Sequence, residues 1–229
     1  KNHHIKEKVI RSNKEEPKSE KTENIVALSV FAFLMIIILA LFTNGFGLYN
    51  PNVSKDRINV PIGPDDAIRG NATYPQLVVV VYSEFECPFC KRGEDTMMEL
   101  FNKYNDNMVF VFKHFPLTSI HPHAFNASVA VECAGEQGKF WEYHDTLFSH
   151  NTMLSPAELK AYAKELGLDE EQFNHCLDTG KYAFKVLSDV NEGRELGVSS
   201  TPTFFINGIA ILGAQPASEF EKVISKEIE

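Results

Sequence analysis

Two cysteines separated by two residues form the part of the sequence best suited to chemistry. Cys87-Pro88-Phe89-Cys90 follows a short apolar run and opens a segment with helical spacing. Two thiols at this spacing can close a small disulfide ring and reopen it by exchange with other thiols. A helix N-terminus offers unpaired N–H groups and partial positive charge, which stabilise a thiolate on the first cysteine. The pattern therefore predicts dithiol exchange, with Cys87 as the exposed nucleophile and Cys90 as the recessed resolving thiol.

Zinc binding is the alternative use of the same pair of thiols. A zinc ribbon needs a second Cys-x-x-Cys, but the other two cysteines, Cys133 and Cys176, each stand alone in the sequence. The sequence favours redox chemistry over a structural metal site, and it implies no metal and no organic cofactor.

The elements that must position the cysteines follow a strand–helix–strand order. Residues 77–82 form a continuous β-branched run, which is typical of a strand buried on both faces. A helix is expected over 87–104 and a second strand over 108–113. Two strands joined by a helix in this way predict a βαβ unit with parallel strands.

A helical block and a hairpin follow this unit. Residues 122–196 contain no convincing strand, and the predicted helices span 122–136, 139–150, 156–166, 169–177 and 182–196. Two short strands, 203–206 and 209–212, flank Asn207-Gly208, which is a strong hairpin signal. A final amphipathic helix starts near Ser218. The sequence therefore predicts an α/β fold ordered βαβ, helical block, ββα.

The N-terminal region is predicted to anchor the chain in a membrane. Residues 25–42 contain one polar residue, Ser29, and a helix of that length is about 27 Å long, close to the thickness of a hydrocarbon core. Residues 5–24 carry six Lys/Arg and residues 49–68 carry two, which places the N-terminus in the cytoplasm. The domain is then expected on the outer face of the cytoplasmic membrane. A cleaved signal peptide is the alternative, although no A-x-A-like site follows the apolar run.

Composition and charge argue against several classes of protein. The 229 residues are 44% apolar and carry a net charge of −9, which argues against a disordered chain and against a nucleic-acid partner. The expected organisation is a cytoplasmic tail, a transmembrane anchor, a Pro- and Asn-rich tether and the α/β domain, over 1–24, 25–48, 49–76 and 77–229.

Three segments resemble the DsbA-type thiol–disulfide oxidoreductases. They are Tyr-Ser-Glu-Phe-Glu-Cys-Pro-Phe-Cys-Lys-Arg at 82–92, His-Phe-Pro-Leu at 114–117 and Gly-Val-Ser-Ser-Thr-Pro-Thr-Phe-Phe-Ile-Asn-Gly at 197–208. The resemblance implies a thioredoxin fold with a helical insertion, here at about 118–180. It makes Cys87 the attacking thiolate and Cys90 the resolving thiol. It also makes Pro202 a cis-proline that binds an extended substrate peptide together with Thr201 and Phe89.

Two positions depart from the pattern of that family. Many of its members carry a buried acid six residues before the first cysteine, where this chain has Val81. Glu84 and Glu86 lie nearby and are interpreted as a solvated rim rather than a proton relay. Phe89 stands where the strongest oxidants of the family carry histidine, so we predict a less oxidising potential than theirs.

The resemblance also implies a disulfide between Cys133 and Cys176, because some members join their insertion in this region. Closing a loop of this length is worth roughly 4 kcal/mol in the chain-entropy model. Two buried, unlinked thiols are the alternative.

The histidines are scattered and are interpreted as structural or capping residues rather than metal ligands. The six that follow residue 100 are His114, His121, His123, His144, His150 and His175. Of these, His114 follows the second predicted strand, so it is the one placed to line the active face.

The sequence therefore predicts a membrane-anchored enzyme that introduces disulfides into exported, cysteine-containing polypeptides through Cys87. The family implies that a quinone-linked membrane partner reoxidises it. One alternative is a reductase or isomerase on the same fold, kept reduced by a membrane electron donor. Another is a redox-inert chaperone module that binds peptides in the same groove.

Overall fold

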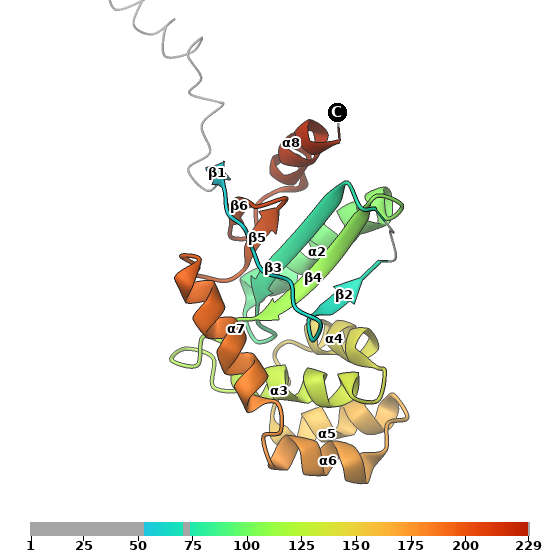
Figure 1. Ribbon diagram of the computed structural model, residues 1–229. Helices are drawn as coiled ribbons and strands as arrows, with labels where there is room; N and C mark the ends of the chain where they lie inside the picture. The colour runs from blue at the N-terminus through green and yellow to red at the C-terminus, as the bar shows by residue number, and fades with distance from the viewer. Residues whose placement is uncertain (1–52, 71–73, 229) are drawn as a thin grey trace, which may run out of the picture. The chain divides into compact units, whose positions relative to one another are not determined.

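A six-stranded sheet forms the centre of the domain in the computed structural model, which describes residues 53–70 and 74–228 (Figure 1). The strand order is β1-β6-β5-β3-β4-β2, and β3 and β4 are parallel, as the βαβ pattern predicts. The strands are β1 (Val53–Arg57), β2 (Ala67–Arg69), β3 (Leu77–Ser83), β4 (Met108–His114), β5 (Thr203–Ile206) and β6 (Ile209–Leu212).

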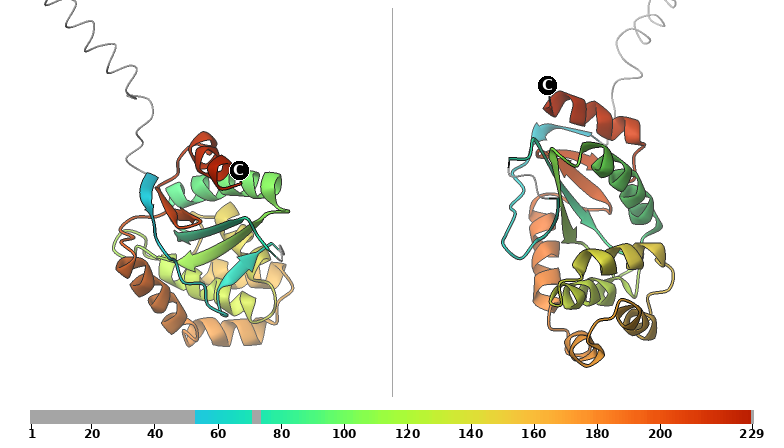
Figure 2. Two further views of the ribbon diagram at one scale, coloured as in Figure 1. Left: turned by 45° about the horizontal axis from the view of Figure 1, so that its top comes forward. Right: turned by 90° about the vertical axis from the view of Figure 1, so that its right-hand side faces the viewer.

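Helices cover both faces of this sheet. Helices α2 (Pro88–Tyr104) and α8 (Ala217–Glu227) lie on one face, and α7 (Ala183–Glu195) lies on the other (Figure 2). The remaining helices form a block below the sheet in Figure 1: α3 (Ala124–Gly135), α4 (Phe140–Ser149), α5 (Pro156–Glu165) and α6 (Glu170–Asp178). Helices α2 to α7 begin and end within two residues of their predicted bounds, and α8 begins at Ala217, one residue before its predicted start.

Strand β3 separates two apolar cores. Val79 and Val81 are buried in a large core with Met97 of α2, whereas Val80 is buried in a smaller core with Val190 of α7. Successive side chains of a strand point to opposite faces, so a strand covered on both sides needs a continuous apolar run. This explains why β3 is recognisable in the sequence.

Part of the segment predicted as a tether and entry to the domain, 49–76, belongs to the sheet. Strand β1 pairs antiparallel with β6, and β2 pairs antiparallel with β4. Both are edge strands that attach through backbone hydrogen bonds, so they need no apolar run. Asp66 is also buried in ion pairs with Lys113 and Lys185, at 2.9 Å each. The α/β domain therefore begins by residue 53 rather than at 77.

Within the described residues, no helix combines the length and apolar character needed to cross a bilayer. The predicted anchor at 25–48 and the predicted tail at 1–24 lie outside those residues.

Candidate active site

The first cysteine lies at the N-cap of α2, directly after the turn that leaves β3. Its backbone is extended, with φ −75° and ψ 122°, and Pro88 follows in the first turn, where a missing N–H breaks no helical hydrogen bond. Cys87 and Cys90 are both buried, with 4% and 0% of their surfaces exposed. The sequence predicts an exposed Cys87. Its sulfur is covered instead by the segments that carry Thr201 and His121.

The surroundings move the pKa values of these two thiols apart. The pKa of Cys87 is lowered to about 5, first because the Cys90 thiol donates a hydrogen bond to its sulfur. The backbone N–H groups of Phe89 and Cys90 add donors at the helix start, while burial opposes the shift. Burial is the largest cause that raises the pKa of Cys90, and the neighbouring Cys87 adds to it. Near neutral pH, Cys87 is therefore a thiolate and Cys90 a thiol.

The segment before β5 faces the dithiol. The Thr201–Pro202 peptide bond is cis, and the Thr201 carbonyl oxygen lies 3.9 Å from the Cys87 sulfur. The Thr201 hydroxyl is buried, and its side chain lowers the pKa of Cys87 and so favours the thiolate. The structure thus brings Thr201 and Pro202, both identified from the sequence, next to the cysteines.

A glycine permits this close approach. A Cβ atom on Gly93 would lie 2.9 Å from Cγ of Pro202 and 3.1 Å from Cζ of Phe204. Carbon atoms in contact prefer about 3.5–4.0 Å, so any side chain at this position would displace the proline segment or α2. Gly93 therefore sets the distance between the helix that carries the cysteines and the cis-proline.

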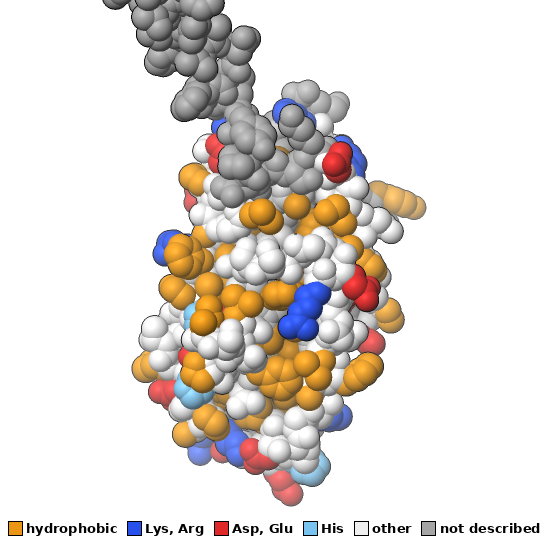
Figure 3. All heavy atoms as spheres, turned by 90° about the vertical axis from the view of Figure 1, so that its left-hand side faces the viewer, with side chains coloured by type: hydrophobic (Ala, Val, Ile, Leu, Met, Phe, Trp, Pro, Cys, Tyr) orange, Lys and Arg blue, Asp and Glu red, His pale blue; other side chains and the backbone are white. Residues whose placement is uncertain are grey.

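Apolar side chains are exposed near the helix start. Phe89 is 54% exposed, and the Arg92 guanidinium lies over its ring at 4.3 Å from the ring centre. Ile120, in the loop after β4, is 66% exposed. The side of the domain that carries α7 and this loop shows apolar side chains gathered across its middle (Figure 3).

A buried glutamate lies beside the dithiol, and this corrects the interpretation of Glu84 as a solvated rim. Glu84 is 0% exposed, and its Oε2 accepts the backbone N–H groups of Glu86 at 2.7 Å and Cys87 at 3.1 Å. Its Oε1 pairs with Nδ1 of His121. Burial raises the pKa of Glu84 to about 7, while the attraction of His121 opposes this shift. The tight turn between β3 and α2 needs acceptors for its N–H groups, which explains why a carboxylate is buried there.

His114 does not line the active face. It is 0% exposed, and its Nε2 lies 2.8 Å from Oε1 of Glu132 on α3. Its backbone N–H donates to Asp189 of α7 at 3.1 Å. This histidine therefore connects β4 to two helices.

Two groups of potential metal ligands occur among the described residues. They are Glu84, Cys87 and His121, and Glu94, His144 and Asp145. Within the first group, Glu84 and His121 already bind each other. In the second group, burial raises the pKa of Glu94 to about 8 and lowers that of His144 to about 4, so both are neutral near pH 7. We therefore assign no metal to either group.

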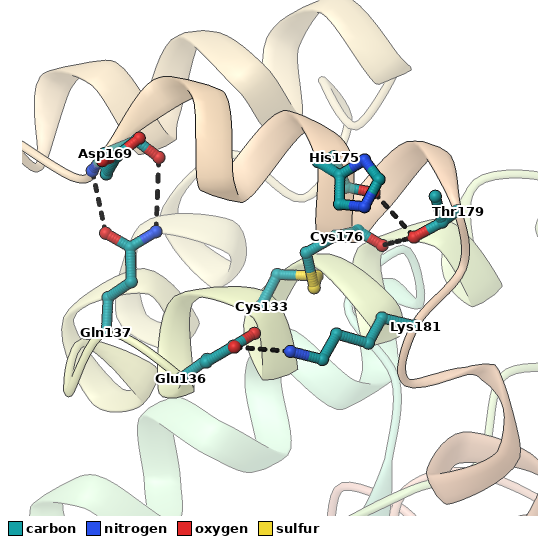
Figure 4. The surroundings of a disulfide bond; sticks show 8 residues. All are labelled: Cys133, Glu136, Gln137, Asp169, His175, Cys176, Thr179 and Lys181. Carbon is teal, nitrogen blue, oxygen red and sulfur yellow. Dashed lines mark hydrogen bonds and ion pairs between the residues drawn. A yellow bond between two sulfur atoms is a disulfide. The ribbon is translucent and has the colours of Figure 1, made fainter.

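The second cysteine pair is bonded inside the helical block. Cys133 of α3 and Cys176 of α6 form a disulfide, with their Cα atoms 5.9 Å apart (Figure 4). Lys181 pairs with Glu136 beside it, and the Gln137 side chain hydrogen-bonds the backbone of Asp169 at the start of α6. This is the pair that the resemblance implies.

A protein-family model described as Thioredoxin matches residues 64–226. The chain belongs to the thioredoxin family. Among solved structures, this thioredoxin-family chain is similar to oxidised BdbD of Bacillus subtilis, with a TM-score of 0.67, 22% identity, and coverage of 76% of this chain and 98% of that one. It is also similar to α-DsbA1 of Wolbachia pipientis, with a TM-score of 0.62, 23% identity, and coverage of 73% and 92%. These similarities show that the chain shares its fold with BdbD and α-DsbA1.

Curated relatives of this thioredoxin-family chain are longer proteins. A Na(+)/H(+) antiporter NhaA 1 of Salinispora arenicola is 43% identical over 150 residues, which cover 65% of this chain and 23% of that protein. A protein of the same name from Mycolicibacterium vanbaalenii is 35% identical over 203 residues, which cover 87% and 32%. The matched segment thus spans less than a third of the length of these relatives.

Proposed function

We propose that this domain introduces disulfides into exported proteins by dithiol–disulfide exchange, with Cys87 as the nucleophile. The proposal rests on the pKa values of two neighbouring thiols, which are shifted in opposite directions. The pKa of Cys87 is lowered to about 5 at the helix start, and that of Cys90 is raised by burial. A stabilised thiolate favours the reduced form of the pair, which is the property of an oxidant.

Each catalytic cycle proceeds in two thiol–disulfide exchange steps. A substrate thiolate attacks the Cys87 sulfur of the oxidised enzyme, the Cys87–Cys90 bond breaks, and the Cys90 sulfur leaves with the electron pair and takes up a proton. The second substrate thiolate then attacks the substrate sulfur of the mixed disulfide, and Cys87 leaves as a thiolate. The substrate loses two electrons and two protons. The enzyme gains two electrons and one proton, and the other proton goes to solvent because Cys87 stays ionised.

The proposed substrates are unfolded or extended polypeptides that contain cysteine. They would bind beside Thr201 and Pro202, over the apolar surface of Phe89 and Ile120, which are 54% and 66% exposed. Apolar side chains next to a reactive sulfur suit chains that have not yet buried their own apolar residues.

The proposed location is the outer face of the cytoplasmic membrane, with residues 25–48 as the anchor and 1–24 in the cytoplasm. The uncharged segment 25–48 and the excess of Lys/Arg before it support this location. A quinone-linked membrane protein is proposed to reoxidise the Cys87–Cys90 pair after each cycle.

The test uses the full-length chain in detergent. The oxidised wild type should convert a dithiol peptide to its disulfide, and Cys90→Ala should accumulate a mixed disulfide between Cys87 and its substrates that mass spectrometry can identify. A wild type that leaves the peptide reduced would contradict the proposal.

Thiol trapping in intact cells separates this proposal from its alternatives. An oxidase should be trapped mainly with Cys87 and Cys90 oxidised, whereas a reductase or isomerase should be trapped mainly reduced. A redox-inert chaperone module would keep its cellular function in Cys87→Ala.

A further inference from the structure

Two segments far apart in the sequence bring an acid and a histidine to the Cys87 sulfur. Glu84 lies in the turn after β3, and His121 lies in the loop between β4 and α3. One carboxylate oxygen, one imidazole nitrogen and the Cys87 sulfur all lie within 4.8 Å of one another. The proposed exchange mechanism uses neither Glu84 nor His121.

Glu84 holds both neighbours in place. Its Oε2 accepts the N–H of Cys87 at 3.1 Å, which fixes the backbone that carries the sulfur. Its Oε1 pairs with Nδ1 of His121, which fixes the orientation of the ring. The Glu84 side chain is 0% exposed, whereas the His121 side chain is 18% exposed. The pair therefore connects the buried dithiol to solvent through the histidine.

The charges of the pair decide what it does to the sulfur. A buried carboxylate alone would repel the Cys87 thiolate, and this repulsion contributes to the raised pKa of Glu84. The imidazole of His121, paired with Oε1 of Glu84, counters this repulsion when it carries a proton, because its positive charge then offsets the carboxylate charge beside the sulfur. The nearby carboxylate of Glu86 is engaged elsewhere, because it accepts the backbone N–H of His123 at 2.7 Å.

We propose that Glu84 and His121 are positioning residues for Cys87, in which His121, held by Glu84, stabilises the thiolate from the loop between β4 and α3. The inference rests on the proposed function, since it concerns the same sulfur. The stabilisation acts when Cys87 leaves the mixed disulfide with its electron pair, and no bond forms to either residue. His121 thus acts on the sulfur from the loop after β4, whereas Phe89, between the cysteines, has no ionisable group.

The test is a pH titration of Cys87 in the reduced full-length protein. Thiolate absorbance at 240 nm monitors the ionisation. His121→Gln should move the titration to higher pH by roughly one unit, because an opposite charge within about 4–6 Å is lost. At equilibrium with glutathione, the same variant should shift toward the oxidised form by about tenfold, since one pKa unit is a factor of ten. The matched control is His123→Gln in the same loop, whose side chain makes no capping hydrogen bond. The control should titrate like the wild type.

A double-mutant cycle tests whether His121 acts through Glu84. In the Glu84→Gln background, the His121→Gln shift should fall to less than half its size, because the imidazole is no longer oriented. A circular dichroism melt checks that each variant is folded.

Two outcomes would overturn the proposal: superimposed titrations of His121→Gln and His123→Gln, or additive effects in the cycle. This titration needs no substrate, so it can fail while the wild type oxidises dithiol peptides, and the two failures are distinguishable.

Discussion

The two cysteine pairs are both buried, yet their surroundings prepare them for different uses. Cys87 and Cys90 are three residues apart at a helix start, where N–H groups, the Thr201 hydroxyl and the Glu84–His121 pair surround the first sulfur. Cys133 and Cys176 join two helices within the apolar core of the helical block. Burial alone raises the pKa of a thiol. The comparison teaches that hydrogen-bond donors near the sulfur, rather than exposure, mark the reactive pair.

The largest expected difference between the pairs concerns activity. Cys87→Ala should abolish the oxidation of a dithiol peptide, because no other sulfur in the described domain has a lowered pKa. A discontinuous assay of peptide thiols measures this loss. Oxidation that persists in Cys87→Ala would break the comparison, since the nucleophile would then lie elsewhere.

Removal of the second cysteine pair should affect stability alone. Cys133→Ala/Cys176→Ala should lower the free energy of unfolding by roughly 2–5 kcal/mol, the usual effect of removing a native disulfide. Urea denaturation followed by circular dichroism measures this change. Peptide oxidation by the folded variant should match the wild type, and a large loss of activity would show that the two pairs are linked.

The active pair should also make stability depend on pH. The folded Cys87 has lost its proton above about pH 5, whereas an unfolded cysteine keeps its proton up to about pH 8.5. The reduced protein should therefore gain stability as the pH rises between these values, by up to about 1.4 kcal/mol per unit, and lose the gain as the pH falls through 5.

Cys87→Ser is the control for this dependence. The difference in unfolding free energy between the reduced wild type and Cys87→Ser should increase from pH 5 to pH 7. A difference that stays constant would show that the Cys87 thiolate is not stabilised by the fold.

The smallest predicted effect concerns the packing around the active pair. Gly93→Ala should destabilise the domain by about 1–3 kcal/mol, because the added methyl group overlaps Pro202 and Phe204. Gly63→Ala is the matched control, since the nearest atom to its Cβ is 3.9 Å away. The control should stay within about 0.5 kcal/mol of the wild type. Equal melting curves for the two variants would contradict the close approach at Gly93.

Much of the fold could be predicted because its signals are local. The β-branched run of β3, the Asn207-Gly208 turn and the cysteines at the start of α2 each depend on neighbouring residues. Strands β1 and β2 were missed because they are short, lie at the sheet edges and pair through the backbone. Their side chains carry no alternating apolar pattern.

The site was less predictable where it depends on distant segments. The burial of Glu84 follows from the N–H groups of a tight turn and from His121, which reaches it from another loop. No spacing in the sequence connects these two residues. The role of Gly93 likewise depends on Pro202, which comes more than a hundred residues later.

The pH dependence of alkylation tests the central claim most directly. Reduced full-length protein is treated with iodoacetamide across a pH series, and peptide mass spectrometry measures the modification of each cysteine. The account predicts that Cys87 reacts with a midpoint near pH 5 and that Cys90 stays unmodified at pH 7. A Cys87 midpoint near pH 9, or faster modification of Cys90, would contradict it.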